Sequence, residues 1–188
     1  GIAGGHLAFC IRQAAGSTPG VLTFTAVELL AQGITNRGGP AAAILLTAQG
    51  NMMDAGLLKV RMAIPLATPG FALRYSGSLG VMDLTRLSPF LDIVQHLRIK
   101  SGRATAASFD IEFAAGRARG WVRATYYDLT IAVLDNKTGT EKGFGNRVAT
   151  FVANRFNIEH DNAPEEPDPM NVGMVYYRRK PADTFLKV

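Results

Sequence analysis

The sequence has few of the residues on which enzymes and metalloproteins depend. It contains one cysteine, one tryptophan and three histidines in 188 residues. A lone cysteine forms neither an intrachain disulfide nor a cysteine-rich zinc cluster. Cys10 lies in an apolar run, and no histidine stands in a recognisable nucleophile context, so we expect a buried structural thiol. No apolar run reaches the ~20 residues of a membrane-spanning helix, and no signal peptide is visible.

Charge is also scarce, at 19% of the residues, whereas 47% are apolar. This composition excludes a disordered tail and suits one domain with a sizeable core, with a hint of an exposed apolar groove or partner surface. The net charge is +5, but the basic residues are spread along the chain apart from Arg178, Arg179 and Lys180. The aromatic and basic signature of RNA-binding folds is missing. We therefore expect a solvated basic face and no nucleic-acid partner.

Residues 98–135 have the clearest pattern in the chain. Phe109, Ile111 and Phe113 alternate with polar neighbours, which is typical of a strand with one buried face. A second arm alternates in the same way from residue 127 to 133. We expect a long antiparallel hairpin that turns near residues 115–117. A change of parity in the second arm predicts a bulge near Tyr126 and Tyr127.

Similar alternation predicts further strands over residues 21–35, 58–64, 71–76 and 170–179, and a short strand is expected at 7–13. The nearly continuous apolar run at 41–48 fits a helix or a strand by periodicity, and its length and Gly-rich flanks favour a strand. We expect a bulge at 27–30, a loop at 49–56, and burial of both faces of the strand at 41–48. Helical spacing and capping residues predict helices over 84–96 and 145–157. The expected fold is mainly β (α+β), a single domain over residues 1–188. It is a long curved antiparallel sheet with two helical segments packed on one face.

No constellation in the sequence predicts catalysis, a metal ion or a cofactor. The acidic loop at 159–168 lacks the ligand spacing and glycine of a calcium site. Asp110 and Glu112 share one face of a strand, but a solvated pair explains them better than acid–base chemistry. Trp121 lies between Arg119 and Arg123 and could stack a ligand, although an ordinary half-buried aromatic side chain between surface arginines accounts for it better.

Several stretches together resemble the C-terminal region of AsmA-like proteins (the AsmA/TamB-type envelope proteins), including their large uncharacterised bacterial branch. The helix entry at 77–89, the strand at 116–129 ending in Tyr-Asp-Leu, and Tyr177-Arg178 in the last strand follow the family pattern. Ala153-Asn154 and Asn162 are similar to its "A-N" helix end and following "N-P". The chain departs from the pattern where Ala163 separates Asn162 from Pro164 and where the glycines at 116 and 120 stand further apart.

The resemblance implies a periplasmic domain anchored to the inner membrane by segments outside this sequence. It also implies a long, open, curved sheet whose apolar groove carries lipid acyl chains or bridges the inner and outer membranes. Possible partners would be lipid acyl chains and envelope proteins, and no catalysis or cofactor is implied. The opening glycine and the abrupt end led us to expect a piece of a larger membrane-anchored protein.

Two functions follow as alternatives. The first is a non-enzymatic, lipid-handling or bridging envelope domain. The second is a protein-interaction module with a self-filled apolar core, whose own helices cover the sheet and which has no lipid ligand. In both, twelve side chains should form the apolar groove or core face: Val60, Met62, Ile64, Phe71, Leu73, Tyr75, Phe109, Ile111, Phe113, Leu129, Ile131 and Val133.

Overall fold

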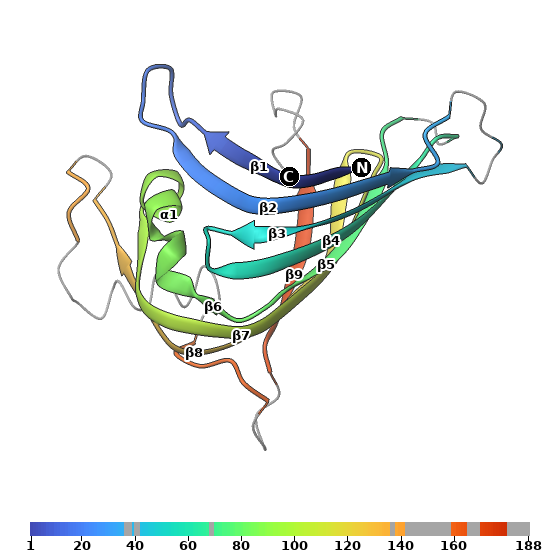
Figure 1. Ribbon diagram of the computed structural model, residues 1–188. Coiled ribbons are helices and arrows are strands. Elements are labelled where there is room, and N and C mark those ends of the chain that lie inside the picture. The colour runs from blue at the N-terminus through green and yellow to red at the C-terminus, as the bar shows by residue number, and fades with distance from the viewer. Residues whose placement is uncertain are drawn as a thin grey trace.

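The computed structural model describes residues 1–35, 39, 42–67, 70–135, 138–141, 159–164 and 170–179. These residues form one curved antiparallel sheet of nine strands, with order β1-β2-β3-β4-β5-β7-β8-β9 and β6 paired to β7 (Figure 1). The strands are β1 Ile2–Ile11, β2 Gly20–Gln32, β3 Ala43–Met52, β4 Gly56–Pro65, β5 Leu73–Leu79, β6 Met82–Asp83, β7 Leu97–Ala114, β8 Arg117–Val133 and β9 Val172–Arg178. The predicted fold class, a long curved antiparallel sheet in a mainly β chain, is confirmed.

The longest strands are β7 and β8, of 18 and 17 residues, and they form the predicted central hairpin. Ala115 and Gly116 connect them with positive φ angles of 49° and 70°. Two positive φ values suit the tight turn that matches the twist of a hairpin. The register shifts three times along the pair, and Asp128 on β8 has a φ of 55°. The β8 irregularity therefore lies next to the position predicted for the bulge.

The helical segment consists of η1, Leu84–Leu87, and α1, Ser88–Val94. The Asp83 carboxylate accepts a hydrogen bond from the Thr85 amide at 2.9 Å, which caps η1. Figure 1 shows α1 inside the curve of the sheet, where it contacts β2 and β7. Gly20 allows this approach, because a Cβ there would collide with Val94 of α1. The first predicted helix is thus confirmed, whereas residues 145–157 lie outside the described part of the chain.

Ten apolar side chains are buried among the described residues, and all come from residues 72 to 134. They are Ala72, Met82, Leu97, Ile99, Ala104, Ile111, Phe113, Ala118, Ala132 and Leu134. Ile111, Phe113 and Ala118 form a cluster, against which Leu73, Tyr75, Val175 and Tyr177 pack. The core therefore lies on the central hairpin and its immediate neighbours.

Three local predictions are wrong. β3 is not buried on both faces, since Leu45 is 50% exposed and no described element lies over it. The expected loop at 49–56 is shorter, because β3 continues to Met52 and only residues 53–55 turn. Met53 and Asp54 adopt positive φ angles there, a conformation that the polar character of the stretch did not reveal. Cys10 is exposed, because β1 is an edge strand rather than part of the core.

Candidate functional site

The strand register divides the sheet into two chemically different faces from β3 to β8, whereas β9 places apolar side chains on both. Side chains alternate between the faces along each strand, so paired residues on neighbouring strands share a face. The apolar face comprises Ile44, Leu46, Ala48, Val60, Met62, Ile64, Leu73, Tyr75, Phe109, Ile111, Phe113, Ala118, Val122, Val175 and Tyr177. The polar face comprises Thr47, Gln49, Lys59, Arg61, Arg74, Ser76, Ser78, Ser108, Asp110, Glu112, Arg117, Arg119, Trp121 and Arg123.

Most of the twelve predicted apolar residues meet on the apolar face. The register aligns Met62 with Tyr75 and Tyr75 with Ile111 across β4, β5 and β7. Phe71 precedes β5 and is 38% exposed, but its ring centroid lies 5.9 Å from that of Phe113. Ile111 and Phe113 are buried, and the other nine residues are partly buried.

Three predicted residues lie apart from this group. Leu129, Ile131 and Val133 follow the irregularities of the hairpin, near the end of the sheet that α1 covers. Ile131 pairs with Ile99, and Val133 pairs with Leu97. Because several register shifts intervene, these side chains do not continue the rows that contain Phe109, Ile111 and Phe113.

Sequence reasoning missed part of the apolar face. Val175 and Tyr177 pack on the core from β9, whereas Val172, Met174 and Tyr176 are exposed. The β9 sequence is apolar at both parities, so alternation could not choose the inward set. The strand register determines which β9 side chains face the core, since Val175 lies opposite Gly120 and Tyr177 opposite Ala118.

Glycine shapes the centre of the apolar face. A Cβ at Gly77 would overlap the Phe109 ring and the Lys59 carbonyl. The absence of a side chain lets the Phe109 ring lie over β5 and meet Tyr75 edge to face, with ring centroids 6.0 Å apart. Burial at this position raises the pKa of the Tyr75 hydroxyl. Gly77 therefore lets the Phe109 ring cover β5, and the apolar face continues across this strand.

The charges of the polar face are partly paired. Arg74 on β5 donates two hydrogen bonds to Asp110 on β7, at 3.0 and 2.7 Å. The hydrogen bond from Arg74 lowers the pKa of Asp110. Gln49 donates to Glu28 at 2.7 Å. An acid whose charged form is stabilised in this way is a poor proton donor near neutral pH.

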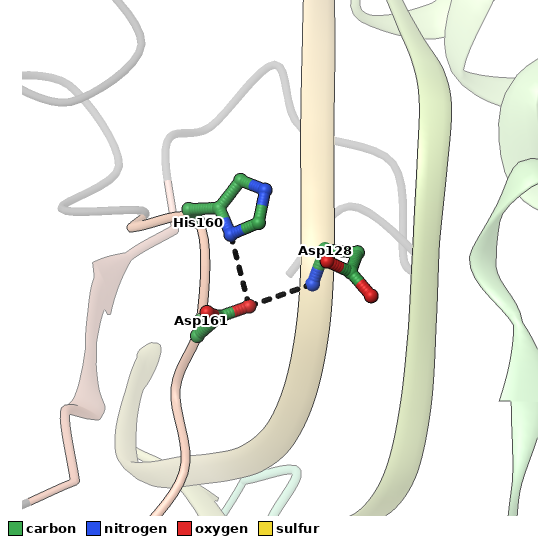
Figure 2. A group of neighbouring side chains, drawn as sticks. All are labelled: Asp128, His160 and Asp161. Atoms are coloured by element: carbon green, nitrogen blue, oxygen red, sulfur yellow. Dashed lines mark hydrogen bonds and ion pairs between the residues drawn. The ribbon is translucent and has the colours of Figure 1, made fainter.

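A second polar cluster joins residues distant in sequence. Figure 2 shows the Asp161 side chain between His160 and the β8 residue Asp128. One Asp161 oxygen accepts a hydrogen bond from the Asp128 amide at 2.6 Å and lies 3.0 Å from Nδ1 of His160. The hydrogen bond from Asp128, then that from His160, lowers the pKa of Asp161. Ligand atoms of all three residues lie within 4.8 Å of one another, as in a cation site, but all three are exposed.

The neighbouring contacts explain this cluster better as an attachment of residues 159–164 to β8. Asn162 is 6% exposed, and its side-chain amide donates to the carbonyls of Ala124 and Asn171, at 2.7 and 3.0 Å. Its side-chain oxygen accepts from the Asn171 amide at 2.7 Å. Its backbone pairs with Tyr126. Asn162 therefore ties three segments together, a role that its place in a sequence motif did not reveal. Among the acidic loop residues, 165–168 lie outside the described part of the chain.

No protein-family model, curated protein sequence or solved structure matches the chain. None of the described helices has the length and apolar character needed to cross a membrane.

Proposed function

We propose that this chain is a non-enzymatic, AsmA-like domain of the bacterial cell envelope whose apolar face binds lipid acyl chains. The observation that carries the proposal is a row of apolar side chains in register across the sheet. It runs from Leu46 through Met62, Tyr75 and Ile111 to Val175. Among the described residues, the helical segment packs on β2 and β7, and Leu46, Met62 and Tyr75 in this row are only partly buried.

Such a surface favours a long, flexible hydrocarbon ligand. An acyl chain can lie along the apolar face without hydrogen bonds, and each fully buried methylene contributes about 0.8 kcal/mol. Ten methylenes, each half buried, would contribute roughly 4 kcal/mol before ordering costs. The charged side chains of β4 and β5 and of the regular part of β7 (Lys59, Arg61, Arg74, Asp110 and Glu112) lie on the opposite face, so they do not oppose binding.

The resemblance to AsmA-like proteins supports the compartment in this proposal. The domain would work in the periplasm, held to the inner membrane by segments outside this sequence. There it would pass lipid toward the outer membrane or bridge the two membranes together with other envelope proteins.

A matched pair of variants on β3 tests lipid binding. Leu46→Glu places a charge on the apolar face, and Thr47→Glu places the same charge on the polar face one residue away. Native mass spectrometry after incubation with phosphatidylglycerol should show bound lipid on the unmodified chain and on Thr47→Glu. Leu46→Glu should lose it, because a carboxylate in contact with hydrocarbon is strongly unfavourable.

Val122→Glu provides a second test of lipid binding in case Leu46→Glu unfolds the protein. Val122 lies on the apolar face and is 37% exposed, so a charge there should be tolerated by the fold. Circular dichroism would check that each variant retains its sheet. Equal lipid binding by all variants, or no binding by the unmodified chain, would overturn the proposal.

A protein-interaction module is the second candidate. The observation in its favour is that Val172, Met174 and Tyr176 are exposed on β9, an edge strand of the sheet. Exposed apolar side chains on an edge strand form a surface on which a partner strand could pair. This candidate predicts an apolar face that binds no lipid, and the same mass spectra distinguish the two.

A further inference from the structure

The polar face is hollowed into a groove of about 860 Å³ that residues of seven strands line. The lining includes Glu28 on β2, Thr47 on β3, Arg61 on β4 and Trp121 on β8. This volume lies within the range of about 300–1,000 Å³ typical of ligand sites. Ala48, Val60 and Phe109 of the apolar strand positions also contribute to the lining, but its polar side chains lie on the face opposite the proposed lipid site, which does not explain them.

The register shows how the groove is built. Ser76 and Ser78 on β5 and Ser108 on β7 provide small side chains at its floor. Longer side chains stand on either side, with Lys59 and Arg61 on β4 paired to the serines of β5. On β8, Arg123 pairs with Ser108, and Trp121 pairs with Asp110. Since β4 and β8 are three strand spacings apart, the two walls stand roughly 14 Å from each other.

The groove carries unpaired positive charge. Asp110 is paired with Arg74, and Glu28 accepts a hydrogen bond from the neutral Gln49 and keeps its negative charge at the β2 end of the groove. Lys59 and Arg61, on β4, form no ion pair within the described residues. Across the groove, the Arg123 guanidinium lies 5.7 Å from the centroid of the Trp121 ring. An anion would satisfy the β4 cations, and the serine hydroxyls could donate to or accept from a ligand rich in hydroxyl groups.

We propose that this groove binds an acidic oligosaccharide. Its carboxylate, sulfate or phosphate groups would contact Lys59 and Arg61, its hydroxyls would contact the serine floor, and one sugar ring would pack against Trp121. A width of roughly 14 Å suits an extended glycan lying across the strands. Single-stranded nucleic acid fits less well, because it needs several aromatic platforms for successive bases. Two aromatic residues are among the described lining residues, and the register directs Trp121 to the polar side and Phe109 to the apolar side.

The experiment uses the fact that Trp121 is the only tryptophan of the chain. Its fluorescence therefore reports on the groove directly. Titration with dextran sulfate oligosaccharides should change this fluorescence saturably, whereas neutral dextran should have little effect. The Lys59→Ala/Arg61→Ala double variant should bind about tenfold more weakly or worse, because two charge-assisted contacts are removed.

A charge-matched control separates a site from general attraction between a basic protein and a polyanion. Arg86→Ala/Arg103→Ala removes the same charge from exposed positions that do not line the groove. This variant should bind dextran sulfate within about twofold of the unmodified chain. Equal weakening in both double variants would overturn the proposal, as would tighter binding of a single-stranded oligodeoxythymidine. Lack of any fluorescence change would overturn it too, and none of these outcomes bears on lipid binding by the apolar face.

Discussion

The first 71 residues and the following 63 form the same sheet but differ in how they are stabilised. All ten buried apolar side chains belong to residues 72–134, and the strands β1 to β4 contribute none. In β1 to β4 the apolar side chains contact one another along the sheet surface and remain partly buried or exposed. A sheet of continuous hydrogen-bonded strands can therefore have its stability concentrated in one half and its open surface in the other.

The difference has a physical cause in the neighbours of each strand. β7 pairs with β5, β6 and β8, and the helical segment packs on it. β3 and β4 have paired strands on both sides, and the main further contact in the described part of the chain is that of β6 with β4. Burial needs atoms above a side chain as well as beside it. The strands β3 and β4 therefore provide the surface on which the proposed lipid would complete the burial.

The largest expected effect is the loss of Phe113, which is 4% exposed in the central cluster. Phe113→Ala should lower the free energy of unfolding by about 3–5 kcal/mol, because it removes a buried ring and leaves a cavity. The counterpart in the other half is Leu46→Ala, a partly buried side chain of β3. We expect a loss of about 1 kcal/mol there, in proportion to its smaller burial.

Urea unfolding followed by circular dichroism measures both values in the absence of lipid. Equal losses in the two variants would contradict the contrast between the halves. Adding lipid should stabilise the unmodified chain more than Leu46→Ala, since ligand that binds only the folded state stabilises it by mass action.

A smaller effect is expected at Asn162, which holds residues 159–164 against the hairpin. Asn162→Ala should lower the free energy of unfolding by about 1–3 kcal/mol, because the Ala124 carbonyl and the Asn171 amide lose a buried partner. Amide hydrogen exchange in this variant should become faster in β8 and stay unchanged in β2. Faster exchange across β1 to β4 would mean that the two halves unfold together.

The fold was predictable wherever apolar and polar residues alternate strictly. The segment from Leu58 to Ile64 was correctly assigned to a strand, and Phe109, Ile111 and Phe113 were correctly placed on one face. In these segments the period of two fixes both the element and the side that is buried. The central turn was predictable because Gly116 readily adopts a positive φ angle.

The rest depended on which strands are neighbours. The polar groove could not be predicted, because Arg61, Ser76, Asp110 and Trp121 are brought into one row only by the register of four strands. The burial of Asn162 depends on contacts with Ala124 and Asn171, which are distant in sequence. Exposure of β3 was missed because a continuous apolar run is typical of a strand covered on both sides, and here the second cover is missing among the described residues.

The smallest expected effect concerns the salt bridge between Arg74 and Asp110, which joins β5 to β7. Because the folded protein lowers the pKa of Asp110 from its ordinary value of 3.8, the carboxylate stabilises the fold above that value. This stabilisation is lost as the pH falls through the lower pKa of the folded state. Asp110→Asn should therefore unfold at a slightly lower urea concentration than the unmodified chain at about pH 7, and the difference should shrink as the pH falls below 3.8. The Arg74 side chain is 65% exposed, so solvent screening keeps the effect small.

Arg74→Ala should abolish most of the pH dependence of the stability difference between Asp110 and Asn at this position. A stability difference that grew toward acid pH would contradict the sign argued for the salt bridge.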